Sequence, residues 1–261
     1  MKNVVFSVLL YFVVSFSWAQ NLNYYQSNAV KVVADTYYGT DVLGNYYYSN
    51  ASILYKKTSD KIFSYQNVSL GKISSVDTLN PLLIVVFYAD FNSCVLLDNQ
   101  FNEIKTINFN QLQEPLLLSL LGLSSQNELW FFDTLQQKIG LLNYNTLSYR
   151  FISNPIENNI VHYANNYNYF IWFDKLNKLH TLNRFGVIDN LENPYPQSHI
   201  ILGNTDDVIF YDDLKMVYYN LQKKQMQDIY VDNFLGKNLW LKNGILSTFT
   251  NQEILTFQIK K

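Results

Sequence analysis

The chain alternates between short apolar or aromatic runs and polar turns, and a set of three such runs recurs along it. In the clearest copy, residues 129–133 are followed by residues 139–143 and then by residues 148–152. The first run ends in Asp, the second ends in Asn or Asp, and a polar turn follows each of them. Short runs of β-branched and aromatic residues between turn residues are typical of β-strands. The four best copies cover residues 83–107, 129–152, 169–188 and 207–229.

The aspartate that ends the first run marks each copy of the repeat. Asp90, Asp133, Asp174 and Asp212 are separated by 43, 41 and 38 residues. A propeller blade has four strands and a period of about 40 to 50 residues. Weaker copies at residues 46–65 and 239–259 raise the number of repeats to six, and a short strand candidate precedes each triplet. The pattern predicts an all-β chain that folds as a β-propeller of six four-stranded blades.

Other all-β architectures fit the pattern less well. A seven-bladed ring is the alternative, but it needs blades of about 35 residues, which is shorter than the marker spacing. A two-sheet sandwich does not predict that one triplet recurs. Because an open array exposes strand edges, we expect the ring to close, with residues 29–33 paired beside residues 254–259. For the sixth blade, the first strand is expected at residues 229–231 or 234–235.

The composition supports a strand-rich globular domain. Hydrophobic residues make up 48% of the chain and charged residues 15%, and 21 Tyr and 18 Phe stand against only 9 Gly and 5 Pro. Aromatic side chains favour half-buried pleated strands. The formal net charge is −2 and the basic residues are scattered, so the sequence lacks the positive patch that nucleic acids or anionic membranes require. We therefore expect no nucleic-acid partner.

The N-terminus has the three parts of a secretory signal. Lys2 supplies a positive charge, residues 4–16 are almost wholly apolar, and the small residues Ser17 and Ala19 stand where a signal peptidase cleaves. The apolar run is shorter than the roughly 20 residues that cross a bilayer. We therefore expect residues 1–19 to be a signal peptide that is removed after Ala19, and residues 20–261 to form one propeller domain in the periplasm.

The sequence carries no recognisable catalytic or metal-binding signature. Cys94 is the single cysteine, so an intramolecular disulfide is impossible, and its apolar surroundings indicate a small buried side chain. His162, His180 and His199 are too far apart in sequence to form the close ligand pairs of metal sites. Glycine-rich phosphate loops and the usual hydrolase motifs are missing from the sequence. We predict no metal, no cofactor and no catalytic residues.

The marker aspartates are the first candidate binding site. Aspartate accepts hydrogen bonds from backbone N–H groups a few residues on, which is enough to explain its place at the start of a turn. In a propeller, however, these turns share one face with the blade-to-blade connections, so Asp90, Asp133, Asp174 and Asp212 are expected to form a ring on one rim. A ring of carboxylates can hold a basic segment of a partner or a cation, although residues on separate blades rarely supply a full calcium shell.

The tryptophans of the mature chain are the second candidate site. Trp130, Trp172 and Trp240 are expected on the same strand of their repeats, a few residues before the turn. Burial between blades accounts for them, because aromatic rings contribute the largest packing area. An aromatic platform for a sugar or a peptide is the alternative.

The three aromatic-Asp endings Phe131-Phe132-Asp133, Trp172-Phe173-Asp174 and Phe210-Tyr211-Asp212 give the chain its resemblance to known proteins. In this respect it resembles divergent, uncharacterised periplasmic β-propeller proteins of Gram-negative bacteria, over about residues 28 to 260. The resemblance is architectural. It implies an exported propeller and assigns no functional residue.

Export, a rigid scaffold and the absence of a catalytic constellation lead to one main functional hypothesis. The chain is expected to be a non-catalytic scaffold or interaction module of the periplasm, an accessory subunit of an envelope complex such as outer-membrane protein assembly or protein secretion, with envelope proteins as partners. A carbohydrate- or peptide-binding propeller is the alternative. A hydrolase or lyase that draws carboxylates from several blades is the third hypothesis.

Overall fold

The structure is a computed structural model. It describes residues 22–157, 159–191, 199–203, 207–211, 216–221, 223–231, 239–242, 245–250 and 252–259. The predicted signal peptide, residues 1–19, and the marker residue Asp212 lie outside this described part.

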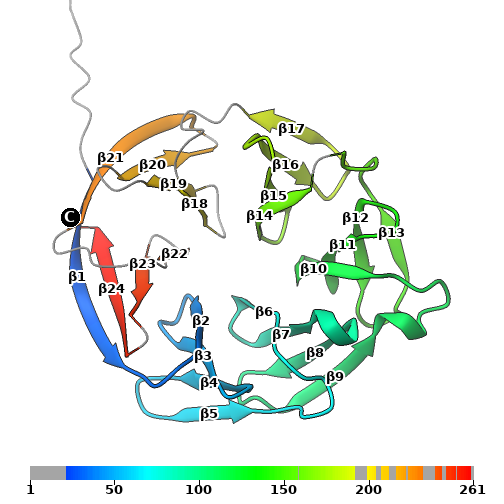
Figure 1. Ribbon diagram of the computed structural model, residues 1–261, viewed down its shortest axis with the longest axis horizontal. Coiled ribbons are helices and arrows are strands. Elements are labelled where there is room, and N and C mark those ends of the chain that lie inside the picture. Colours follow the sequence, from blue (N-terminus) through cyan, green and yellow to red (C-terminus); the bar gives the residue numbers. More distant parts are fainter. Residues whose placement is uncertain are drawn as a thin grey trace, which may run out of the picture.

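The described strands form six blades of four strands each, arranged in a ring around a central channel (Figure 1). This confirms the predicted fold class and blade number. Blade 1 consists of β2 (Thr36–Thr40), β3 (Tyr46–Asn50), β4 (Ile53–Lys57) and β5 (Ile62–Tyr65). Blade 2 consists of β6 (Ser75–Asn80), β7 (Leu83–Tyr88), β8 (Ser93–Asp98) and β9 (Glu103–Asn108). Blade 3 consists of β10 (Leu118–Leu123), β11 (Glu128–Asp133), β12 (Lys138–Asn143) and β13 (Tyr149–Phe151).

The second half of the chain continues in the same way. Blade 4 consists of β14 (Ile160–Asn165), β15 (Tyr169–Asp174), β16 (Leu179–Asn183) and β17 (Ile188–Leu191). Blade 5 consists of β18 (His199–Leu202), β19 (Asp207–Tyr211), β20 (Met216–Asn220) and β21 (Gln225–Val231). Blade 6 consists of β22 (Leu239–Lys242), β23 (Ile245–Phe249), β24 (Glu253–Ile259) and, from the other end of the chain, β1 (Leu22–Lys31).

The sixth blade closes the ring with strands from both ends of the chain. Strand β1 runs antiparallel to β24, with Ala29 opposite Leu255 and Val30 opposite Ile254, so the predicted closure is confirmed. The predicted numbering of strands within this blade is wrong. Residues 239–259 supply its first three strands, and residues 229–231 belong to the outer strand of blade 5. The physical reason is that β1 supplies the fourth strand, so blade 6 needs only three from the C-terminal segment.

Within each blade the first strand lies nearest the channel and the fourth lies at the rim, as Figure 1 shows for β10 to β13. The middle strands are the apolar-aromatic runs of the repeat, and all six residues of β11 are buried. Side chains of successive blades pack against each other. Between blades 3 and 4, for example, Trp130 and Leu141 share a cluster with Phe170 and Trp172. Successive side chains of a strand point to opposite faces of the blade, so a continuous apolar run supplies apolar residues to both faces. Each face is then covered by a neighbouring blade.

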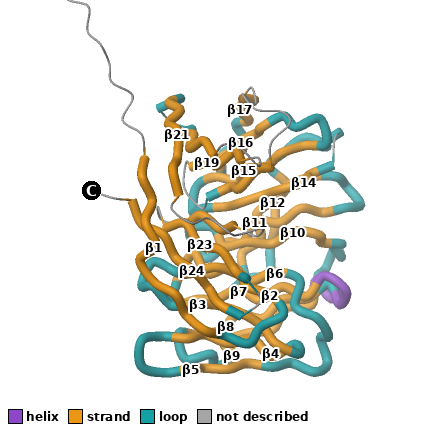
Figure 2. Tube along the Cα trace, turned by 60° about the vertical axis from the view of Figure 1, so that its left-hand side comes forward, coloured by secondary structure: helices purple, strands orange, loops and turns teal. Residues whose placement is uncertain are grey.

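Helical structure in the described residues is confined to two short 3₁₀ turns, η1 (Ala89–Phe91) and η2 (Phe109–Gln111). Figure 2 shows that strands and loops account for almost all of the described chain. Cys94 on β8 is fully buried, and burial raises the pKa of its thiol. This is the buried, unreactive cysteine that the sequence predicts.

Candidate functional site

The antiparallel blades give the ring two distinct faces. We define the upper face as the one that carries the turns between the second and third strands and the connections between blades. The lower face carries the turns between the first and second strands and between the third and fourth. Strand β11 therefore begins at the lower face with Glu128 and ends at the upper face with Asp133.

On the upper face, the start of blade 3 is clamped by two buried polar side chains. Asn92 of blade 2 donates from Nδ2 to the carbonyl of Leu116 (2.6 Å) and accepts the Leu118 N–H at Oδ1 (2.9 Å). Asp133 accepts the N–H of Leu117 at Oδ1 (2.7 Å), while the Leu117 carbonyl accepts the N–H of Thr134 (2.8 Å). This short segment is thus bonded on both sides along its backbone.

The clamp fixes a small apolar surface. Phe91 precedes Asn92 directly, Leu117 lies in the clamped segment, and Leu135 follows Asp133 by two residues. Their side chains are 49%, 44% and 69% exposed. We call these three residues the blade 2–3 patch. The exposed acidic residues Asp90 and Glu114 stand in the turn before the patch and in the connection that leads to it.

The structure gives the marker aspartates different surroundings. Asp133 is only 1% exposed, and its second oxygen accepts the N–H of Gln136 (2.8 Å). Asp90 is exposed and lies in η1. Asp212 lies outside the described residues. Their carboxylates therefore do not share one environment, and a binding role for these residues stays a prediction.

Asp174 is the corresponding buried aspartate of blade 4, with different hydrogen-bond partners. It is 2% exposed, and its Oδ1 accepts the N–H groups of Leu176 (2.8 Å) and Lys178 (2.9 Å) while Oδ2 bonds Nε2 of His180 (3.0 Å). Burial by itself raises the pKa of Asp174, but the Lys178 N–H, the His180 ring and the Leu176 N–H outweigh it and hold the pKa below the usual range. Leu176 is 62% exposed, in the same place relative to its aspartate as Leu135.

The tryptophans fall on two kinds of strand. Trp130 on β11 and Trp172 on β15 are buried between blades. Trp240 instead lies on β22, the innermost strand of blade 6, so the expectation of one shared strand is wrong for this residue. It is half-buried, packs edge-on against Tyr37 and lines the central channel. A ligand-binding role for the three rings stays a prediction.

The central channel contains a pocket of about 250 Å³ lined by residues of five innermost strands. Three aromatic side chains, Tyr38, Tyr163 and Trp240, contribute to its wall. A polar bridge crosses it, because Asp77 of blade 2 accepts from Nδ2 of Asn165 in blade 4 (2.7 Å). The same nitrogen bonds the carbonyl of Leu123 in blade 3 (3.0 Å), so three successive blades are tied together.

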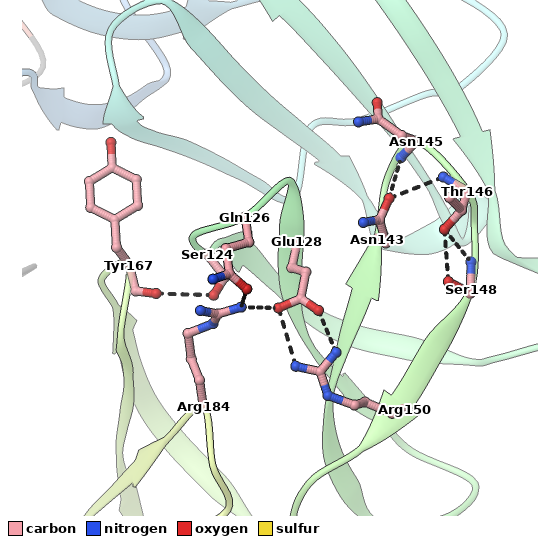
Figure 3. Close-up of polar contacts among 10 residues, drawn as sticks. All are labelled: Ser124, Gln126, Glu128, Asn143, Asn145, Thr146, Ser148, Arg150, Tyr167 and Arg184. Atoms are coloured by element: carbon pink, nitrogen blue, oxygen red, sulfur yellow. Dashed lines mark hydrogen bonds and ion pairs between the residues drawn. The ribbon is translucent and has the colours of Figure 1, made fainter.

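On the lower face, a buried carboxylate is held between two arginines, as Figure 3 shows. Glu128 begins β11, and its side chain is 8% exposed. Both oxygens of Glu128 accept from Arg150 on β13, while Arg184, in the turn between β16 and β17, bonds Oε2. Burial by itself raises the pKa of Glu128, but the hydrogen bonds from the two guanidinium groups outweigh it and hold the pKa below the usual range.

These arginines open onto a surface pocket at the boundary of blades 3 and 4. Its volume is about 520 Å³, and we call it the arginine pocket. It is lined by Gln126, Arg150, Phe151, Ile152, Arg184 and Phe185. Sequence reasoning missed this site, although a signal was present: the chain has two arginines in all, and a phenylalanine follows each of them.

Two general features of the described residues complete the description. Their acidic, histidine and cysteine side chains form no group of three or more that could hold a metal ion. None of the helices in the part of the chain that the structure describes is long and apolar enough to cross a membrane.

No protein-family model matches the chain, and no curated protein sequence matches it. Solved structures share its fold. A streptogramin B lyase superposes with a TM-score of 0.59 at 12% identity, covering 92% of this chain and 98% of the lyase. BBS1N in complex with ARL6DN gives 0.57 at 13% identity, with 87% and 79% covered. A member of the DUF4221 family from Bacteroides vulgatus gives 0.55 at 9% identity, with 93% and 99% covered. At these identities the similarity shows the propeller fold alone.

Proposed function

We propose that the chain is an exported, non-catalytic interaction module of the periplasm, which docks onto an envelope protein through the blade 2–3 patch. The observation that carries the proposal is the clamp on Leu116–Leu118 by Asn92 and Asp133. Single exposed apolar residues are common on protein surfaces. Here, however, Leu117 lies in the clamped segment, and Phe91 and Leu135 lie in the two neighbouring turns, next to the clamping side chains Asn92 and Asp133, which are only 4% and 1% exposed.

Rigidity and charge support this choice of surface. Because the clamped segment is already ordered, binding does not have to order a loop of this chain, and the conformational-entropy cost of association is smaller. The partner expected here carries apolar side chains that cover Phe91, Leu117 and Leu135, with a lysine or arginine beside them that faces Asp90 or Glu114. Such charges at the rim of an interface mainly increase the association rate and the specificity. BBS1N, which has the same fold, was solved in complex with ARL6DN, so a propeller of this size can engage another protein.

Site-specific photo-crosslinking in cells that naturally produce the protein tests the docking surface. A photoreactive amino acid at Leu135 should give a discrete adduct with one envelope protein, while the same residue at Leu147, an exposed leucine of the lower face, should not. Replacing Asp90 with Lys should reduce the Leu135 adduct by about threefold or more, because a rim charge is reversed. Equal adducts at positions 135 and 147, or none at either position, would overturn the proposal.

Export is tested separately. Fractionation of the same cells should place the protein in the periplasmic extract, and N-terminal sequencing should begin at Gln20. A protein that stays in the cytoplasm with Met1 at its N-terminus would contradict this part of the proposal, whatever the crosslinking shows.

A carbohydrate- or peptide-binding role is the second candidate, and the central pocket favours it. Tyr38, Tyr163 and Trp240 offer aromatic faces, and Asp77 and Asn165 offer polar groups between them. Apolar walls with a few convergent polar groups are the usual composition of a ligand site. Its test is a thermal-shift screen of sugars against the protein and its Trp240→Ala variant. A sugar that stabilises the first and not the second would favour this function.

A further inference from the structure

The arginine pocket stands on the opposite face from the blade 2–3 patch, and the inference from it does not depend on the docking proposal. The chain has 19 basic residues, of which only Arg150 and Arg184 are arginines. They come from different blades, yet both bond the same carboxylate. Each is followed by a phenylalanine that also borders the pocket, although the Phe151 ring packs on the other face of blade 3, against Phe131 and Tyr149. Arginine differs from lysine in presenting a planar fork of donors that matches a carboxylate or phosphate.

The guanidinium groups keep hydrogen-bonding capacity that Glu128 does not use. A guanidinium has five N–H bonds, and Arg150 directs Nη1 and Nη2 at Glu128 while its side chain remains 52% exposed. Arg184 bonds Gln126 (3.0 Å) and Glu128 through Nη2. Its Nε is buried, and within the described residues it has no hydrogen-bond partner. An unpaired buried donor is energetically unfavourable, so the hydrogen-bonding capacity of Arg184 is not fully used.

The charge of the pocket is positive. Two guanidinium groups face one ionised carboxylate, which leaves a net charge of +1 for the cluster. Glu128 is not among the lining residues, so among the residues that the structure describes the charged side chains that line the space are the two arginines. A ligand with a single negative charge matches this balance better than a dianion.

The other half of the pocket is apolar, and the backbone that carries it is held by hydrogen bonds. Phe185 is 90% exposed, which is unusual for so large an apolar side chain. Its position is set by Asn183, whose Oδ1 accepts the N–H groups of Phe185 (2.9 Å) and Val187 (3.0 Å). Gly186 has φ +88°, and a Cβ there would lie 2.9 Å from the carbonyl oxygen of Ile152. The turn therefore rests directly against blade 3 and holds Phe185 beside the arginines.

We infer that the arginine pocket binds a carboxylate that carries an aromatic or branched aliphatic group next to it, as at the C-terminal residue of a polypeptide. The carboxylate would accept from the free N–H groups of Arg150 and from Arg184, and the apolar group would lie on Ile152 and Phe185. Glu128 would position both guanidinium groups. An N-acylated amino acid and the terminus of a longer chain present this same chemistry.

Titration calorimetry with four probes tests the ligand class. N-acetyl-phenylalanine should bind at least tenfold more tightly than its uncharged amide, and more tightly than phenyl phosphate. A hexapeptide ending in Phe with a free carboxylate, compared with its amidated form, distinguishes a polypeptide terminus from an N-acylated amino acid as the ligand. Tighter binding of the free peptide than of N-acetyl-phenylalanine indicates a polypeptide terminus, and equal binding indicates that the terminal residue alone is recognised.

Matched variants tie the binding to the pocket. Arg150→Gln should weaken N-acetyl-phenylalanine binding by tenfold or more, and Phe185→Ala by threefold or more, since both side chains are exposed enough to be replaced without unfolding the chain. Lys105→Gln removes a positive charge from the outer strand of blade 2, and Tyr230→Ala removes an exposed aromatic ring from the outer strand of blade 5. Both controls should change binding by less than twofold.

Several outcomes would overturn the inference. Equal affinity for N-acetyl-phenylalanine and its amide would show that the charge is not recognised, and stronger binding of phenyl phosphate would show that the anion class is wrong. No binding of any probe to a protein with an intact near-ultraviolet circular dichroism spectrum would remove the site altogether. Unchanged binding in Arg150→Gln would place the ligand elsewhere.

Discussion

Strand β11 carries a buried carboxylate at each end, and the two are stabilised in different ways. Asp133, at the upper face, is surrounded by backbone N–H groups of Leu117 and Gln136. Glu128, at the lower face, is paired with the side chains of Arg150 and Arg184. Both are nearly inaccessible, at 1% and 6% of their surface. A carboxylate bonded to backbone organises the chain around it, whereas a carboxylate bonded to arginines organises side chains that a ligand can reach.

The difference assigns a structural role to one end and a positioning role to the other. Removing Asp133 frees a turn and the start of β10 together, so the effect is on folding. Removing Glu128 releases two cations that point at a surface pocket, so the effect is on binding as well as on folding. The following three predictions test this contrast, in order of decreasing expected effect.

Asp133→Ala should have the largest effect. It leaves two backbone N–H groups without their acceptor in a buried site, and each hydrogen bond to a charged group contributes roughly 1.5–3 kcal/mol, so we expect a loss of about 3 kcal/mol in the free energy of unfolding. Urea denaturation followed by tryptophan fluorescence measures it. Asp90→Ala is the matched control on an exposed marker aspartate and should leave the denaturation midpoint unchanged. A small effect of Asp133→Ala would show that water replaces the carboxylate, and the contrast would fail.

Glu128→Gln should have an intermediate effect that depends on pH. Arg184 is 11% exposed and would lose its ionic partner, whereas Arg150 is 52% exposed and regains water, so we expect a loss of about 2 kcal/mol at neutral pH. The folded pKa of Glu128 lies below the ordinary value of 4.5, so its contribution is complete above about pH 4.5 and is lost as pH falls through the folded pKa. Denaturation midpoints of the two proteins should therefore converge on acidification. A gap that stays constant from neutral to acidic pH would contradict the pairing.

Leu135→Ser should have the smallest effect on folding. The residue is only two positions after Asp133, yet its side chain is 69% exposed, and exposed substitutions usually change stability by less than about 0.5 kcal/mol. A thermal melt that matches the unmodified protein, together with loss of the adduct formed from a photoreactive amino acid at Leu117, would show that Leu135 contributes to docking and not to folding. A large drop in melting temperature would show that Leu135 belongs to the fold and not to a docking surface.

Much of the fold was predictable from local pattern. Each strand is recognised from its apolar and β-branched residues and from the turn residue that follows it. The recurrence of three such strands about every 40 residues predicts the blade. The clamp was not predictable. Asp90 and Asp133 occupy the same place in the repeat, but the turn of blade 2 forms the helical segment η1, and Asn92 takes over the bonds to blade 3. Whether such an aspartate is buried depends on the neighbouring blade, which a single repeat does not contain.

The arginine pocket is a second feature that local sequence did not predict. The sequence places Arg150 and Arg184 in equivalent outer parts of neighbouring repeats, 34 positions apart, and each with a phenylalanine after it. Nothing local to either arginine indicates that Glu128 lies between them. That contact exists because blades 3 and 4 pack side by side, so residues distant in the chain meet at the seam.

By itself, the order of apolar and polar residues determined the strands, the period of the repeat and the number of blades, because alternation and turn formation are local properties of the chain. The tertiary structure alone decided which strand of the sixth blade each segment became, which aspartates were buried, and that two arginines share one carboxylate. Those outcomes depend on which blades are neighbours and on the pairing of β1 with β24, which brings the two ends of the chain together. Both follow from closure of the ring, which joins residues far apart in the sequence.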